Sequence, residues 1–303
     1  MLNKISEDNR VKRSVFLRIL PPFVFIAIAF GFSRIENLAF AGYNKIYEVT
    51  TNEIYFMGVD RKKYVDHINK YSIKDVEVYF KEIILRKESE FESEPDGAWK
   101  RFDQVNYVIL NNSKANIDRV NYIRSIMKGL SEITNLRILE VKRKPYSSWE
   151  GVDIAIYINN VSQNITLIQH YDKTRHKIYD STLRSGEYCF AVIGVDDGAR
   201  GLSVSTIGLV DKVRDQSFKS CALEEIIQVF GLTNDMNGLD GSVLNFEDNI
   251  EKYGAIDLLL LRLLYNKKIQ SGSSWIDIKE NIEIIFDEEL NWFEMCFYKR
   301  ICD

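Results

Sequence analysis

Three polar side chains lie close together in the otherwise largely apolar segment CALEEIIQVFGLTND, residues 221–235. Glu224 and Gln228 are one helical turn apart, so they share one face of a helix, and Glu225 lies beside them. Carboxylates are costly to bury without partners. We therefore expect this polar stripe (Glu224, Glu225 and Gln228) to face a cleft, a metal ion or polar partners. The alternative is a partly exposed helix whose stripe meets solvent.

The spacing of these residues is that of HExxHxxGxxH, the zinc helix of the metzincin-type peptidases. In that pattern two histidines bind zinc, the glutamate between them is the general base, and the glycine turns the chain towards a third histidine. Here Glu225 occupies the position of the base and Gly231 that of the turn. The three ligand positions hold no histidine; they are Glu224, Gln228 and Asn234. The segment therefore resembles a zincin helix whose ligands have been replaced.

The replaced ligands offer one carboxylate and two amide oxygens. Zinc sites favour Cys and His, so this is a poor zinc site. Oxygen ligands suit Ca²⁺, Mg²⁺ or Mn²⁺ better. Neutral amides bind such ions weakly unless Asp235, which fits the longer form of the pattern, or a carboxylate from residues 246–248 joins them. We therefore expect no bound metal or cofactor, with zinc and calcium as the alternatives.

The elements around this helix are predicted by hydrophobic periodicity. Strands dominate up to residue 210 and helices follow, which predicts an α+β fold: a twisted mixed sheet packed on the motif helix, followed by a helical C-terminal part. Strands are expected at 104–110, 136–141, 152–159, 188–195 and 202–210. Helices are expected at 73–85, 117–134, 220–230, 255–265 and 275–286, with a last aromatic-rich helix from near Asp287.

Several further segments carry a family resemblance. They are AWKRFDQVNYVIL (98–110), LSEITNLRI (130–138), GSVLNFEDN (241–249) and AIDLLLLRLLYNKKIQSG (255–272). Together with Cys-x-x-Glu-Glu-x-x-Gln-x-x-Gly-Leu-x-Asn-Asp, they resemble the bacterial DUF2927 domain. The resemblance implies a secreted or envelope protein with a zincin-like fold, in which Glu-Glu-x-x-Gln is the usual motif. We assign residues 73–303 to this domain.

The first forty residues have the layout of a signal peptide. A basic region precedes a 14-residue apolar run, ILPPFVFIAIAFGF (19–32), which is short for a membrane span. Ala39-Phe40-Ala41 is a small-x-small cleavage pattern. We predict that residues 1–41 are removed, that 42–72 form an N-terminal extension, and that the protein is exported to the periplasm or the extracellular space. An uncleaved N-terminal anchor, which would hold the protein at a membrane, is the alternative.

Export changes how the four cysteines are interpreted. An even number in an oxidising compartment suggests disulfides, and four cysteines allow three pairings. We prefer Cys189–Cys221 and Cys296–Cys302, the alternative being buried thiols. Six residues of continuous helix would separate the second pair by about 9 Å. The last helix must therefore break if that bridge forms, because a disulfide needs Cα atoms within about 7 Å.

Composition narrows the choice of partners. The net charge of −4 leaves no general basic footprint for nucleic acid. The sequence contains neither a P-loop nor Gly-x-Ser-x-Gly. His170 and His176 have no standard ligand spacing, and we expect them to have ordinary surface roles.

Three functions are compatible with these observations. The first is a catalytically silent zincin-like domain that binds a peptide or protein in a retained cleft. The second is a peptidase-like hydrolase that uses Glu225 as general base with an atypical metal or none. The third is a structural envelope protein. In zincins the antiparallel strand along the cleft edge binds extended peptide, and residues 202–210 are the candidate here; the alternative is a paired interior strand.

Overall fold

The computed structural model describes residues 61–85, 97–101, 103–142, 150–171, 189–196, 201–245 and 250–299. The chain divides into two units, Met1–Thr50 and Thr51–Asp303, and every described residue belongs to the second. The predicted signal peptide, residues 1–41, therefore lies outside the described residues. Within the described ranges no helix is long and apolar enough to cross a membrane.

Helices and strands alternate through the first half of this unit, and helices follow. The strands are β1 (Gln104–Asn111), β2 (Arg137–Glu140), β3 (Ile154–Asn159), β4 (Cys189–Val192), β5 (Val195–Asp196), β6 (Gly201–Leu202) and β7 (Ser205–Val210). The α-helices are α2 (Arg61–Ile68), α3 (Ile73–Phe80), α4 (Ile117–Thr134), α5 (Val161–Tyr171), α7 (Asp215–Gln228), α8 (Ala255–Tyr265), α9 (Trp275–Ile278) and α10 (Ile282–Trp292). Two π-helical segments, η1 (Lys81–Leu85) and η2 (Phe293–Tyr298), continue α3 and α10.

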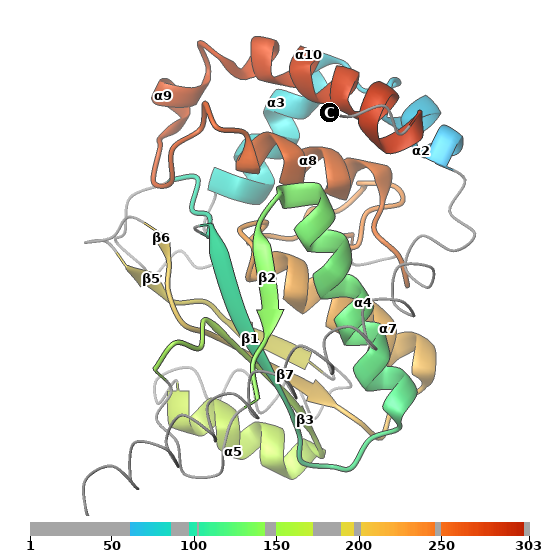
Figure 1. Ribbon diagram of the computed structural model, residues 1–303, viewed down its shortest axis with the longest axis vertical. Helices are drawn as coiled ribbons and strands as arrows, with labels where there is room; N and C mark the ends of the chain where they lie inside the picture. Colours follow the sequence, from blue (N-terminus) through green and yellow to red (C-terminus); the bar gives the residue numbers. More distant parts are fainter. Residues whose placement is uncertain are drawn as a thin grey trace, which may run out of the picture. The chain divides into compact units, whose positions relative to one another are not determined.

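A mixed sheet with the strand order β2-β1-β3-β7-β4 forms the centre of the fold (Figure 1). The β1–β2, β1–β3 and β3–β7 pairs are parallel, whereas β4 runs antiparallel to β7. Strands β5 and β6, which lie between β4 and β7 in the sequence, pair with each other in a small separate hairpin. The prediction of an α+β fold with a mixed sheet is confirmed.

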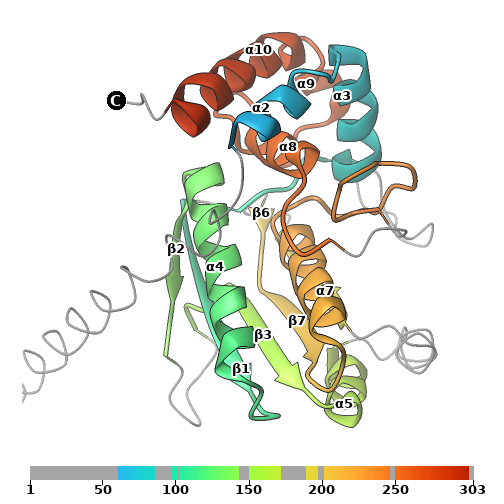
Figure 2. The same cartoon turned by 90° about the vertical axis from the view of Figure 1, so that its right-hand side faces the viewer.

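Helices cover both faces of this sheet. Ile156, Ile207 and Leu209 belong to the large apolar core, which also contains buried side chains of α4 and α7. On the opposite face, Ile168 of α5 packs with Phe190 of β4. The Phe190 ring lies over Gly208 of β7, where a Cβ atom would come within 2.1 Å of it. Figure 2 shows α4 and α7 running side by side along the sheet.

The Leu-rich helix α8 is apolar nearly all round because it is enclosed on several sides. It contacts α2, α3, α4 and α10, and nearly all of its residues are buried. A helix of this composition is typical of a protein core. The helices α2, α3, α9 and α10 gather around it (Figure 2).

The elements differ from the sequence-based expectations in several places. Residues 275–286 form two helices, because α9 ends at Ile278 and a turn, in which the Asn281 amide donates to Ile278, precedes α10. Residues 188–195 and 202–210 were each expected to form one strand, but each is divided in two, into β4 and β5 and into β6 and β7. Strand β7 is an interior strand paired on both sides, as the alternative interpretation of residues 202–210 predicts, so it is not the cleft edge. Helices α2 and α5 were not predicted at all.

Candidate functional site

The polar stripe lies on α7 in largely buried surroundings. Glu225 is 7% exposed and Gln228 8% exposed, whereas Glu224 is partly exposed. Glu224 and Glu225 each take part in a hydrogen bond or an electrostatic interaction. Apolar residues of α7 and of the turn after it (Leu223, Ile226, Ile227, Val229, Phe230) are fully buried around them. The stripe is therefore not a solvated helix face.

A disulfide sets the direction in which this stripe points. Cys221 of α7 is bonded to Cys189 of β4, with the two Cα atoms 5.8 Å apart, as the sequence predicts. Because Cys221 precedes Glu224, Glu225 and Gln228 by three, four and seven residues, it shares their side of the helix. The stripe therefore lies on the side of α7 that is bonded to β4.

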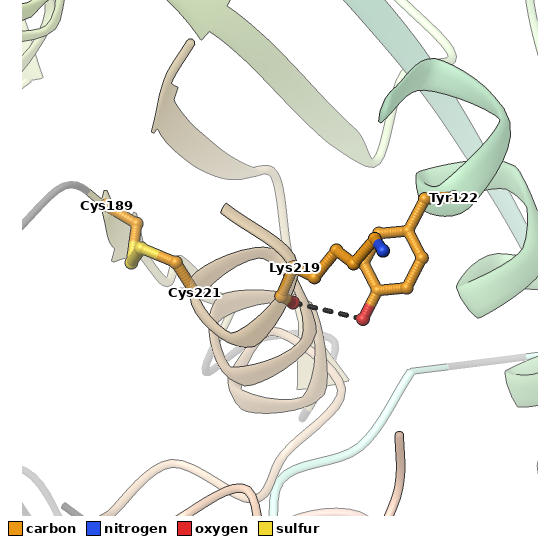
Figure 3. The surroundings of a disulfide bond; sticks show 4 residues. All are labelled: Tyr122, Cys189, Lys219 and Cys221. Atoms are coloured by element: carbon orange, nitrogen blue, oxygen red, sulfur yellow. Dashed lines mark hydrogen bonds between the residues drawn. A yellow bond between two sulfur atoms is a disulfide. The ribbon is translucent and has the colours of Figure 1, made fainter. Parts of the chain in front are cut away.

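The opposite side of α7 is held by α4. Tyr122 of α4 donates a hydrogen bond to the backbone oxygen of Lys219 at 3.1 Å. Figure 3 shows this bond on one side of the helix and the disulfide on the other. Burial raises the pKa of Tyr122 far above its ordinary value, so the phenol stays a donor. These two attachments fix the rotation of α7 about its axis.

The second predicted bridge is tested only in part. Cys296 is disulfide-bonded, but its predicted partner Cys302 lies outside the described residues. The last helix ends at Tyr298, ahead of residue 302, as such a bridge requires.

Gly231 ends α7 in the way that the sequence pattern predicts. Its φ is +107°, a region that side-chain-bearing residues rarely adopt. The Gly231 amide donates to Gln228 O and the Leu232 amide donates to Ile227 O, which is the Schellman arrangement. A Cβ atom at this position would lie 2.3 Å from Trp99 O and 2.7 Å from a Leu264 methyl carbon. Only glycine fits the turn without a shift of its neighbours.

The chain after Gly231 returns to the stripe through Asp235. Gln228 Nε2 donates to Asp235 Oδ1 at 3.2 Å. Asn234, which occupies the third ligand position, is buried and donates both its backbone and its side-chain N–H to the oxygen of Ile83 in η1. The structure thus brings Gln228 and Asp235 together, and it uses Asn234 to attach this turn to η1.

Arg101 is a central residue of this region that was not among the predicted site residues. Its side chain is buried and donates to Val229 O at 2.8 Å, Ser203 O at 3.0 Å and Ser205 Oγ at 2.7 Å. Burial lowers the pKa of Arg101 to about 10. It joins the end of α7 to the start of β7. Its place in AWKRFDQ, one of the segments behind the family resemblance, was the available signal.

Asp257 was missed as well. It is fully buried at the start of α8 and accepts hydrogen bonds from Ser242 Oγ, the Val243 amide and the Gly254 amide. The signal was an acid in the first turn of an apolar helix, at the position where a capping box places one. Asp257 connects the segment GSVLN to the helix AIDLLLLRLL.

The arrangement offers acceptors and amide groups, with no cluster of strong metal ligands. Across the described ranges, no three His, Cys, Asp or Glu side chains gather closely enough to hold a metal ion. His170 is exposed in α5, and His176 lies outside the described residues, as do residues 246–248.

Hydrogen bonds join the described parts of the segments that resemble a family in the sequence: Arg101 donates to Val229, Ser242 to Asp257 and Arg262 to Ile133. The family model described as "Protein of unknown function (DUF2927)" matches residues 74–284. The chain belongs to the DUF2927 family. The matched range extends from α3 into α10 and includes the polar stripe, Arg101 and Asp257. No curated protein matches this DUF2927 chain.

Proposed function

We propose that this DUF2927 domain is an exported, zincin-like binding module. On this proposal it takes an extended peptide along strand β4, next to the polar stripe, and lacks standard zinc-peptidase chemistry. One observation supports this proposal most strongly. Strand β4, the antiparallel strand at the edge of the described sheet, is disulfide-bonded through Cys189 to the side of α7 that carries the polar stripe. In zincins, the antiparallel strand along the cleft edge is the one that binds peptide.

The geometry of β4 supports strand addition. Its backbone pairs with β7 on one side, from Cys189 opposite Leu209 to Val192 opposite Thr206. No other described strand pairs with its second side. An added peptide would gain main-chain hydrogen bonds there, and alternate side chains would supply specificity.

The hairpin beyond β4 can lengthen this edge. Gly194 follows β4, and a Cβ atom there would lie 2.4 Å from Ser203 Oγ and 2.5 Å from Val204 O. Glycine therefore permits the two arms of the hairpin to approach closely before β5 begins at Val195. The candidate edge covers residues 189–196.

Export is supported by cysteine chemistry. The Cys189–Cys221 bridge is typical of proteins that fold in an oxidising compartment. The partner is then a peptide or protein of the bacterial envelope or its surroundings, since a net charge of −4 gives no general basic footprint for nucleic acid.

Hydrogen exchange tests the peptide proposal. A random peptide library displayed on phage is selected on the full chain, and the amide exchange of the chain is followed with and without an enriched peptide. We expect protection of residues 189–192, with no change in β2, the opposite edge of the described sheet. Protection of β2 alone, or no enrichment of any peptide, would exclude strand addition at β4.

A hydrolase is the second candidate, favoured by the buried carboxylate of Glu225 in the position of a general base. The enriched peptide is incubated with the wild type and with Glu225→Gln, and the products are weighed by mass spectrometry. Cleavage by the wild type that falls about 10²–10⁴-fold in the variant would support the hydrolase. An intact peptide in both samples supports the binding module.

A further inference from the structure

The sheet has a second notable position, at the carboxyl ends of β1 and β3. These neighbouring strands are parallel, so their carboxyl ends lie at the same end of the sheet. The chain leaves β1 for α4 on one face of the sheet, and it leaves β3 for α5 on the other face. This arrangement is a topological switch point, and open α/β sheets typically bind ligands outside the strand ends at such a point. Figure 1 shows β3 ending next to α5, at the end of the sheet away from α8.

This switch point is separate from the polar stripe. Helix α7 begins at Asp215, shortly after β7 ends, and runs back along the sheet. The stripe therefore approaches the other end of the sheet, where β7 begins and where Arg101 connects Val229 to Ser205. A ligand at the switch point would be independent of the proposed peptide site.

A chain of amide side chains crosses the switch point. Asn112 Nδ2 donates to Asn159 Oδ1 at 2.9 Å, and Asn159 Nδ2 donates to Asn164 Oδ1 at 2.9 Å. Asn164 is fully buried in the first turns of α5, and its Nδ2 has no hydrogen-bond partner within the structure described; nor does the buried Ser113 Oγ. A buried donor without an acceptor is uncommon and calls for an explanation. The donor at the end of this chain can be satisfied by an acceptor-rich ligand.

The charges around the switch point favour a negative ligand. The first turn of α5 contains no acidic residue. The side chains that cap this end, Asn160 and Gln163, are neutral, so they add no negative charge to offset the positive end of the helix dipole. Lys114 is exposed on the loop after β1 with a φ of +59°, and it forms no ion pair with any described residue. The nearby Asp211 is paired with Arg119 at 3.1 Å.

We propose that the switch point between β1 and β3 binds a small oxyanion, a phosphate or a carboxylate. Lys114 supplies the positive charge, and the first backbone amides of α5, at Val161 and Ser162, supply donors in the way helix amino termini bind anions. Asn164, three residues after Val161 in the same helix, supplies the buried donor, which becomes accessible when the hydrogen-bonded side chains of Asn112 and Asn159 rearrange.

The test is a titration of the full chain with sodium phosphate, against sodium chloride at equal ionic strength, followed by backbone amide NMR shifts. Saturable shifts are expected at Lys114, Val161 and Ser162. Lys114→Asn keeps a residue that tolerates positive φ and should weaken binding about fivefold. Lys252→Asn removes an exposed lysine elsewhere and should leave binding unchanged.

Asn164→Asp tests the buried donor. The aspartate can still accept from Asn159, but it removes the donor and adds a negative charge, so binding should weaken about tenfold or more. If this variant does not fold, the two lysine variants still decide. The proposal is overturned by the absence of saturable shifts with both phosphate and acetate, or by an equal loss of affinity in Lys114→Asn and Lys252→Asn.

Two further arms identify the source of the anion. Acetate shows whether a carboxylate binds; shifts of the same amides by either anion support an oxyanion site, and shifts by neither overturn it. If phosphate binds, vesicles of phosphatidylglycerol and of phosphatidylcholine are sedimented with the chain. If the chain sediments with phosphatidylglycerol vesicles but not with phosphatidylcholine vesicles, and does so only with Lys114 present, the phosphate belongs to a lipid headgroup. If the chain sediments with neither kind of vesicle, the ligand is a free phosphate.

Discussion

Gln228 donates a hydrogen bond to Asp235 at 3.2 Å, across the turn that ends the motif helix. The bond connects the polar stripe to the segment that carries the third ligand in a zinc helix. The partner is Asp235, whereas Asn234 in the ligand position itself is hydrogen-bonded to Ile83 of η1. Two of the three positions that would hold zinc ligands in a zinc helix, Gln228 and Asn234, are therefore hydrogen-bonded to Asp235 and to the neighbouring backbone.

The first prediction concerns Gly231. Gly231→Ala should lower the free energy of unfolding by at least about 2 kcal/mol, because a positive φ and contacts with Trp99 O and Leu264 both oppose a Cβ atom. Gly238→Ala is the matched control: its φ is +77°, and a Cβ atom there would meet nothing within 4 Å. The control should cost about 1 kcal/mol. Urea denaturation of both variants measures the difference, and equal losses would contradict the close packing at Gly231.

The second prediction concerns the bridge between β4 and α7. The cysteines are 32 residues apart, so the bridge should stabilise the fold by about 3–4 kcal/mol in the chain-entropy model. Replacing both Cys189 and Cys221 with serine should remove this stabilisation, as measured by denaturation under non-reducing conditions. Peptide mapping without reductant provides the check on connectivity: a peptide joining Cys189 to Cys296 or Cys302 would refute the pairing.

The third prediction concerns Asp257. Burial raises the pKa of this carboxyl above its ordinary value, and hydrogen bonds from Ser242, Val243 and Gly254 lower it in part. A group whose pKa is raised by folding contributes stability below its unfolded-state pKa and loses that contribution as pH rises through the folded-state pKa. Asp257→Asn can keep all three hydrogen bonds with its oxygen accepting the two amides and its nitrogen donating to Ser242.

The free energy of unfolding of Asp257→Asn relative to the wild type should therefore increase as pH rises from about 3 to 8. Thermal melts of both proteins across this range provide the measurement. If the difference in unfolding free energy between the two proteins stays constant with pH, the pKa of Asp257 does not change on folding.

The sequence predicted much of this fold because the local signals agree with the packing. Helix α4 occupies residues 117–134 as expected, with Asn116 accepting from the Asp118 amide at its start and Asn135 in a left-handed conformation at its end. The pairing of Cys189 with Cys221 was also predicted. The helix was predictable because its periodicity lies within one short segment, and the disulfide because four cysteines allow only three pairings.

The failures arise where tertiary contacts decide. Helix α5 is rich in β-branched residues, which favour strands, and the reciprocal bonds between Asn160 and Gln163 that start it were not recognised. The interior position of β7 depends on β3 and β4, which are distant in sequence. Arg101 gains its role from partners about one hundred residues away or more, so its segment AWKRFDQ could point to the family but not to the groups that Arg101 contacts.

The fourth prediction concerns the amino terminus. Protein recovered from the cell envelope should begin at Gly42, because the basic region, the apolar run and Ala39-Phe40-Ala41 form a signal-peptide layout. Intact-mass measurement decides between cleavage and an anchor. A mature chain that begins at Met1 would contradict cleavage.

Native mass spectrometry of the full chain with an enriched peptide, purified without chelator, tests the central claim most directly. A binding module without zinc chemistry predicts a complex whose mass is the sum of the protein and the uncut peptide. A complex that carries one zinc ion, together with peptide fragments that disappear in Glu225→Gln, would contradict the proposal and make the protein a peptidase.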